Sequence, residues 1–216
     1  MKKLIQITLL SALASGFAHA QPSSDVAWTP KQLNFVKKGN SSNGQKLSAS
    51  CAGCHGEQGV SMTPENPSLA GQLATYLYKQ LQDYKKGQRE HAVMTSMASG
   101  LSEQDMADIA AWYSALPLPK NKADPSNAKA AELLVSRGDG KRTLPPCAVC
   151  HGSTGKGEKM DIPALAGQQP AYLTATLLAF KEGSRHNDIY SRMRLIAQQL
   201  SPEEIKAVAN YYQQLQ

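Results

Sequence analysis

The 216-residue sequence contains only four cysteines, and all four lie in two short segments, residues 51–55 and 147–151. No cysteine is therefore left for a structural disulfide elsewhere in the chain. Aromatic residues make up only 6% of the sequence, which is little for two independent hydrophobic cores. After residue 20, no stretch is apolar enough to span a bilayer. A chain of this length allows one large domain or two small ones, and two small ones would need a source of apolar bulk other than aromatic side chains.

Both cysteine-containing segments have the form Cys-x-x-Cys-His, which is the attachment signature of a c-type haem. The segments are Cys51-Ala52-Gly53-Cys54-His55 and Cys147-Ala148-Val149-Cys150-His151. In such a motif the two thiols add to the haem vinyl groups, and the adjacent histidine becomes the proximal ligand of the iron. A four-ligand zinc site suits adjacent cysteine and histidine residues poorly. The sequence therefore predicts two covalently attached haem c groups, which would also supply the missing apolar bulk.

The first twenty residues have the features of a secretory signal peptide. Lys2 and Lys3 give a charged start, residues 4–17 form an apolar stretch, and Ala18-His19-Ala20 provides a small-residue cleavage site. Polar and small residues interrupt the apolar stretch, which is also shorter than the roughly 20 residues of a transmembrane helix. We therefore expect a soluble mature protein that is exported to the periplasm.

The net charge of +6 does not indicate a nucleic-acid partner. Of the 23 basic and 17 acidic side chains, Lys2 and Lys3 are lost with the signal peptide, which leaves +4. Four haem propionates would bring the mature protein close to neutral. Export also separates the chain from nucleic acid, so the charge describes the surface and identifies no partner.

The second half of the chain repeats the first. At an offset of 96, the haem motif recurs together with a Leu-Ala-Gly-Gln run and the residues Tyr76, Lys85 and Arg89, which return as Tyr172, Lys181 and Arg185. The last helix returns at an offset of 99, where Ser102 and Asp105 match Ser201 and Glu204 as helix-capping residues. Two copies of one all-helical haem domain explain this pattern.

The repeat sets the expected domain organisation. Residues 1–20 form the signal peptide, 21–40 an N-terminal extension, 41–119 the first domain, 120–125 a polar linker and 126–216 the second domain. The extension is either a flexible arm or contains a short helix after Thr29-Pro30. Helices are expected over 43–50 and 74–86, and after Ser102. Residues 137–146 have no counterpart in the first repeat and should form a surface loop.

The sixth iron ligand decides whether a haem site is open to substrate. Met193 lies seven residues before Leu200, and Met94 lies seven residues before Leu101, which begins the equivalent helix. A ligand must keep its place relative to the packed helix beside it, whereas a loop tolerates insertions. This spacing favours Met94 and Met193, with the three extra residues of the second repeat inside 185–191. Counting forward from the haem motifs instead gives Met97, which is the alternative.

Other methionines and histidines have simpler interpretations. Met106 lies on an apolar helical stripe and is expected in the core. Met62 and Met160 are expected to be packing residues in loops. His91 and His186 occupy unmatched positions in a variable loop and are expected at the surface.

Residues around the haem motifs are candidates for supporting roles. The carbonyl groups of Pro67 and Pro163 could accept a hydrogen bond from Nδ1 of the proximal histidines. A second set could hydrogen-bond the haem propionates, or could instead face solvent or cap helices; it comprises Arg89, Arg185, Gln72, Gln168, Tyr76 and Tyr172.

With these paired motifs and two downstream methionines, residues 41–216 resemble the dihaem cytochrome c4 family. The resemblance implies two tandem class I cytochrome c domains related by a pseudo-twofold axis, with the haem propionates near the domain interface. It also implies His/Met ligation by His55 with Met94 and His151 with Met193. Members of the family are periplasmic electron carriers, soluble or loosely associated with membrane complexes. Family analogy suggests a quinol-oxidising cytochrome complex as electron donor and a terminal oxidase as acceptor.

Two alternative functions keep the same motifs. A dihaem peroxidase or thiosulfate-oxidising enzyme would need an open or displaceable ligand at one haem, and the matching methionines argue against it. A permanent haem subunit of an oxidoreductase complex, such as a sulfide dehydrogenase, would differ only by a constitutive interface. The sequence favours an electron-transfer protein over an enzyme.

Overall fold

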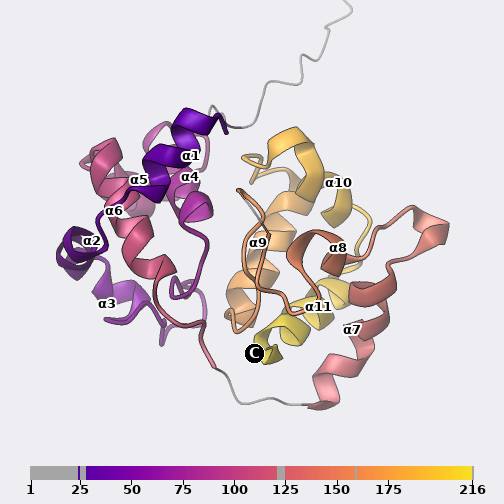
Figure 1. Cartoon of the computed structure of the whole chain (residues 1–216). Helices are drawn as coiled ribbons and strands as arrows, with labels where there is room; N and C mark the ends of the chain where they lie inside the picture. Colours follow the sequence, from indigo (N-terminus) through magenta and orange to yellow (C-terminus); the bar gives the residue numbers. More distant parts are fainter. Residues whose placement is uncertain (1–23, 25–27, 121–124, 159, 216) are drawn as a thin grey trace, which may run out of the picture.

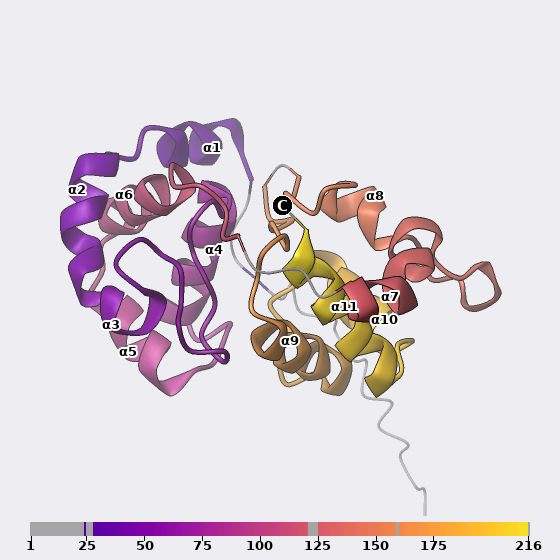
Figure 2. The same ribbon diagram turned by 90° about the horizontal axis from the view of Figure 1, so that it is seen from below.

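The computed structural model describes residues 24, 28–120, 125–158 and 160–215, and these residues form two helical lobes that face each other (Figures 1 and 2). The expected signal peptide and most of the expected linker lie outside the described residues. No strand occurs in the described part, where Asp139 and Leu144 form only an isolated β-bridge. Within the same residues, no helix has the length and hydropathy that crossing a bilayer requires. The predicted all-α architecture is confirmed.

The first lobe contains the helices α1 (Pro30–Lys37), α2 (Ser41–Leu47), α3 (Ala52–His55), α4 (Ala74–Lys85), α5 (Ala92–Ser99) and α6 (Glu103–Ser114). The second lobe contains α7 (Pro125–Arg137), α8 (Cys147–His151), α9 (Pro170–Glu182), α10 (Arg192–Ala197) and α11 (Pro202–Gln214). The helices α4 and α9 lie on the sides of the lobes that face each other (Figures 1 and 2). The repeat in the sequence is therefore a repeat of helices, α3–α6 and α8–α11.

The predicted capping residues begin the last helix of each lobe. Ser102 accepts a hydrogen bond from the backbone N–H of Asp105, whose side chain accepts one from the backbone N–H of Ser102. Ser201 and Glu204 make the same reciprocal pair at the start of α11. These capping boxes satisfy amide groups that a helix start otherwise leaves without partners. They fix where α6 and α11 begin, and each of these helices packs into the core of its lobe.

The cores are small. In the first lobe the buried cluster is built from α1, α4 and α6, and it includes Met106 at 0% exposure, as predicted. In the second lobe, Ala131, Leu173 and Tyr212 belong to one buried cluster, and Leu144, Leu200 and Ile205 form another. Leu144 is therefore a buried residue within the loop 137–146, which the sequence predicted to be a surface loop.

Of the two alternatives for the N-terminal extension, the structure has the short helix α1, which begins with the Thr29 cap and Pro30 in the first turn. Val36 of this helix is buried, and Phe35 contacts Tyr78 of α4 edge to face with ring centroids 6.0 Å apart. The prediction for Met62 is wrong: its side chain is 91% exposed and packs in no core. Met160, at 40% exposure, is also largely at the surface.

Candidate functional site

Each haem-attachment motif forms a single helical turn. The helices α3 and α8 end at His55 and His151, and the glycines that follow, Gly56 and Gly152, have φ angles of 79° and 80°. This left-handed backbone favours glycine, and it turns the chain away directly after the histidine. All four cysteines are free thiols that line one cavity with His55 and His151.

The histidines of the two haem motifs are held in one tautomer. Nδ1 of His55 lies 2.8 Å from the carbonyl oxygen of Pro67, and Nδ1 of His151 lies 2.9 Å from that of Pro163. Because a carbonyl only accepts, Nδ1 carries the proton and Nε2 keeps its lone pair for a metal. Burial lowers the pKa of both histidines, while the proline carbonyls oppose the shift, so the neutral form, which a metal ligand requires, is favoured. The predicted role of the two prolines is confirmed.

The loop that carries each proline is fastened to the turn after the haem motif. The carbonyl oxygen of Gly59 accepts hydrogen bonds from the N–H groups of Leu69 and Ala70 at 2.7 and 3.0 Å. In the second repeat Gly155 does the same for Leu165 and Ala166, at 2.7 and 2.9 Å. A Cβ atom at Gly59 would lie 2.7 Å from the ring of Tyr113, so only glycine fits this turn.

The methionines that the spacing favoured lie near the start of equivalent helices. Met94 is the third residue of α5, and Met193 is the second residue of α10. Both are half-buried and line the cavity. Met97 also lines the cavity, one helical turn later in α5, and is 39% exposed. The structure thus brings all three candidate methionines to the cavity that holds the cysteines and histidines.

The two loop histidines are exposed, as predicted. His91 has a local role that the sequence reading missed, because its Nδ1 accepts a hydrogen bond from the N–H of Met94 at 3.3 Å and so caps α5. Its position directly before a helix would have been the signal for a cap.

The cavity is continuous across the two lobes and has a volume of about 1410 Å³. Its lining combines both haem motifs with apolar side chains such as Leu77, Leu81, Leu173 and Leu177. One cationic group faces it unsatisfied: Nη1 of the buried Arg185 has no hydrogen-bond partner among the described residues. A pair of haems fits these features, since thiols, neutral imidazoles, apolar walls and a cation for a propionate are all present.

The Leu-Ala-Gly-Gln runs join the lobes. Gln72 accepts a hydrogen bond from the N–H of Ala164 at 2.8 Å and donates one to the carbonyl of Ala164 at 2.9 Å. Gln168 makes the same pair with Ser68, at 2.8 and 2.9 Å. Because Gln72 and Gln168 are equivalent in the repeat, the interface is self-complementary, as a twofold relation requires.

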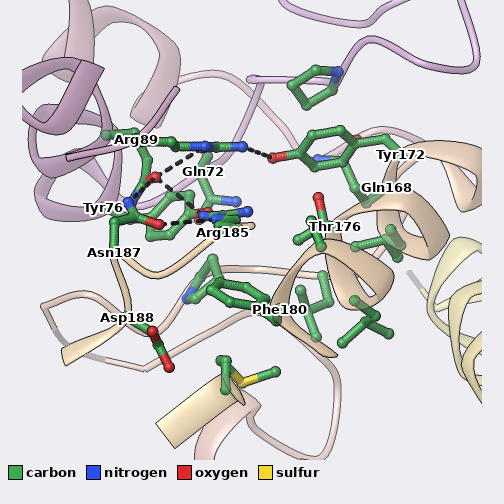
Figure 3. Close-up of a pocket in the computed structure, with 18 of the residues that line it drawn as sticks. Gln72, Tyr76, Arg89, Gln168, Tyr172, Thr176, Phe180, Arg185, Asn187 and Asp188 are labelled. Carbon is green, nitrogen blue, oxygen red and sulfur yellow. Dashed lines mark hydrogen bonds between the residues drawn. The ribbon is translucent and has the colours of Figure 1, made fainter. Parts of the chain in front are cut away.

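A second reciprocal pair crosses the interface beside the first (Figure 3). Nη2 of Arg89 donates to the hydroxyl of Tyr172, and Nη2 of Arg185 donates to the hydroxyl of Tyr76, each at 3.1 Å. Sequence reading placed these residues near propionates, in solvent or at helix caps, and missed that they bind one another across the interface. All four line the cavity as well, so a propionate contact is compatible with this pairing.

Comparisons with known proteins agree with this geometry. The cytochrome c family model matches residues 41–116 and 139–216. The chain is 36% identical to cytochrome c4 of Pseudomonas aeruginosa over the full length of both proteins. The crystal structure of reduced recombinant cytochrome c4 from Pseudomonas stutzeri matches with a TM-score of 0.80 and 40% identity, covering 82% of this chain and 100% of that one. A thiosulfate dehydrogenase electron acceptor of Stutzerimonas stutzeri is 40% identical and aligns with 75% of this chain and 77% of its own length.

The family match over both lobes, the paired Cys-x-x-Cys-His turns and the shared cavity support one assignment. The chain binds two haem c groups covalently and transfers electrons, and it belongs to the dihaem cytochrome c4 family of tandem c-type cytochromes.

Proposed function

We propose that this cytochrome carries electrons in the periplasm between a quinol-oxidising cytochrome complex and a terminal oxidase. In this proposal His55 with Met94, and His151 with Met193, complete the iron coordination in the first and second domain. The observation that carries it is the equivalent placement of Met94 and Met193 at the starts of α5 and α10, on the wall of the cavity that contains the histidines.

The choice of Met94 over Met97 rests on two features of α5. Met94 shares both its position in the first turn and its half-buried state with Met193. Met97 lies one turn further along and is exposed. A pseudo-symmetric pair of domains is expected to place its ligands at equivalent positions, which Met94 and Met193 satisfy.

The chain itself contributes binding, orientation and exclusion of water. Each bound haem supplies one-electron redox chemistry. The proline carbonyls hold the imidazole rings with Nε2 available, and the buried surroundings of His55 and His151 exclude solvent from the ligand bond. A methionine at the sixth position closes the site to substrates and favours the reduced state.

The compartment and the domain limits are part of the same proposal. Residues 1–20 act as an export signal, residues 41–119 and 126–216 form the two haem domains, and residues 120–125 link them. The composition of the N-terminus supports export, and the helical repeat supports the two domains.

A second candidate function follows from one of the relatives. Because a thiosulfate dehydrogenase electron acceptor is 40% identical over 75% of this chain, the cytochrome is also a candidate acceptor, or permanent haem subunit, for a thiosulfate-oxidising enzyme. The two candidates share the fold and the ligands and differ in the electron donor.

Absorption spectra of the holoprotein test the closed sites. We expect two low-spin haems in the reduced protein and a methionine–iron charge-transfer band in the oxidised protein. A high-spin ferric signal, or rapid binding of carbon monoxide at either haem, would contradict the carrier proposal. Reduction rates with a quinol-oxidising complex and with a thiosulfate dehydrogenase plus thiosulfate then separate the two donors.

A further inference from the structure

The loop before Met193 contacts the first domain. Asn187 lies in the segment that contains the three extra residues of the second repeat, and its side chain is almost fully buried. Its Nδ2 donates hydrogen bonds to Asp83 Oδ2 at 2.7 Å and to Gln80 Oε1 at 3.0 Å, both on α4 of the first domain. Figure 3 shows Asn187 beside Arg185, whose Nε donates to Asn187 Oδ1 at 3.0 Å. The second domain thus inserts one amide side chain into a polar site of the first.

The receiving site is a buried ion pair. Nζ of Lys79 donates to Asp83 Oδ2 at 2.5 Å and also to the carbonyl oxygen of Asn187 at 2.6 Å. The side chains of Lys79 and Asp83 are 2% and 0% exposed. A buried ion pair is tolerated when further hydrogen bonds satisfy both charges, and Asn187 supplies two of these bonds, one through its amide and one through its carbonyl. The loop and the ion pair therefore satisfy each other's hydrogen-bonding groups.

The other end of the loop holds the helix that carries Met193. Asp188, the neighbour of Asn187, accepts hydrogen bonds from the N–H of Arg194 at 3.0 Å and from Nε of Arg194 at 2.8 Å. Arg194 directly follows Met193 in α10. Tyr190 and Ser191, which lie between Asp188 and Arg194, have positive φ angles of 58° and 57°. Non-glycine residues rarely keep such angles unless their surroundings impose them.

The first domain holds its own methionine differently. His91 caps α5 directly through the N–H of Met94, within the same domain. The positions in α9 that correspond to Lys79, Gln80 and Asp83 are Ala175, Thr176 and Ala179, so the side chains that bind Asn187 are not repeated. The Asn187 contact therefore has no counterpart in the loop before Met94, which crosses the interface through Arg89 and Tyr172 instead.

We propose that Lys79, Gln80 and Asp83 of the first domain act as positioning residues for Met193 through Asn187. This inference rests on the proposed ligation of the second haem iron by Met193. Its consequence is that the Asn187 contact slows dissociation of Met193 from iron, whereas the Met94 bond does not depend on this contact.

Cyanide binding to the oxidised holoprotein tests this positioning, since an external ligand binds a closed ferric haem only when methionine leaves. The variants are Asn187→Ala and the milder Asn187→Ser. Both should fold, because Asp83 retains Lys79 and Gln80 retains Arg89 and Arg185 as donors. We expect one haem of the two to bind cyanide on the order of tenfold faster in Asn187→Ala, less so in Asn187→Ser, and the other haem to keep the native rate.

Gln169→Ala is the matched control. Its amide donates across the same interface to the carbonyl oxygen of Ser61 at 2.7 Å, away from the loop. Native cyanide rates in this variant are expected. The positioning role would be overturned if Gln169→Ala accelerated cyanide binding as much as Asn187→Ala does. It would also be overturned if Asn187→Ala accelerated binding equally at both haems, or not at all.

Met193→Ala separates this inference from the proposed function. If Met193→Ala leaves both haems closed to cyanide, the ligand assignment itself is wrong. If Met193→Ala opens one haem while Asn187→Ala changes nothing, the ligand assignment holds and the positioning role alone is overturned.

Discussion

The two domains are alike around their haem motifs and differ in the part of the interface where α4 of the first domain meets the loop before Met193. The hydrogen bond between the motif histidine and the proline carbonyl has nearly the same length in both, 2.8 and 2.9 Å. On the facing helices, by contrast, the first domain presents Lys79 and Asp83 where the second has Ala175 and Ala179. Coordination geometry leaves little freedom at the haem, whereas an interface between two covalently joined domains can become asymmetric without losing either site.

The two domains also use different residues to bind the segment before the haem motif to the last helix. In the first domain Asp108 of α6 accepts hydrogen bonds from the N–H of Asn40 and from Asn43 Nδ2, each at 2.7 Å. In the second, Glu204 of α11 pairs with Arg142 of the loop 137–146 at 2.7 Å. Both contacts fasten a segment that precedes the haem motif, so one structural task is solved with different residues.

The largest expected effect comes from removing one attachment site at a time. The double variant Cys51→Ser/Cys54→Ser should keep one covalent haem, and Cys147→Ser/Cys150→Ser should keep the other, because each motif serves its own domain. Haem content per chain and protein mass measure this, with the native protein at two haems as control. Loss of both haems in either variant would show that the domains do not mature independently.

The self-complementary part of the interface predicts paired effects. Gln72→Ala and Gln168→Ala each remove two buried hydrogen bonds to the backbone N–H and C=O of one residue in the other domain. Each change should lower the free energy of unfolding by about 2–4 kcal/mol, because buried peptide groups lose their partners. Denaturant unfolding of the holoprotein measures both. If the two losses of unfolding free energy differed by more than about 1 kcal/mol, the equivalent contacts would not contribute equally to stability.

Loss of the Asp108 contact should destabilise the first domain alone. Burial raises the pKa of Asp108, but hydrogen bonds from Asn43, Asn40 and Gln104 bring it below its ordinary value of 3.8. A lowered carboxyl pKa gives stability that is present above the unfolded pKa and is lost as pH falls through the folded pKa.

Asp108→Ala should therefore lower the stability of the first domain by about 1–3 kcal/mol at pH 7, with a smaller difference below about pH 3.8. Thermal unfolding of the variant and of the native holoprotein, at pH 7 and below about pH 3.8, measures this difference. Ala207, the equivalent residue in α11, offers a matched control site for an Ala→Ser change. A difference that does not shrink in acid would contradict the carboxylate contact.

Much of each haem site could be predicted from local sequence. The haem motif and the capping boxes are short patterns whose geometry follows from neighbouring residues. The change of offset from 96 to 99 also placed the insertion in a loop, where the structure has the short helix Ile189–Ser191. These features could be inferred because each depends only on residues that are close together in the sequence.

The interface could not be predicted in the same way. Arg89 and Tyr172 are 83 residues apart, and nothing in the repeat indicates which faces of the domains meet. Propionate binding by these side chains stays a prediction, whereas their pairing depends on how the two domains meet. The packing predicted for Met62 depends on the fold in the same way. A loop methionine packs only if another element covers it, and none of the described residues covers Met62.

The equivalence of the two haem sites is tested most directly by the methionine–iron charge-transfer band of the oxidised holoprotein in three single variants. Met94→Ala and Met193→Ala should each remove about half of the band, because each methionine closes one iron. Met97→Ala should leave the band unchanged. A half-loss in Met97→Ala together with a native band in Met94→Ala would contradict the equivalence, since the sixth ligands would then occupy different turns of α5 and α10.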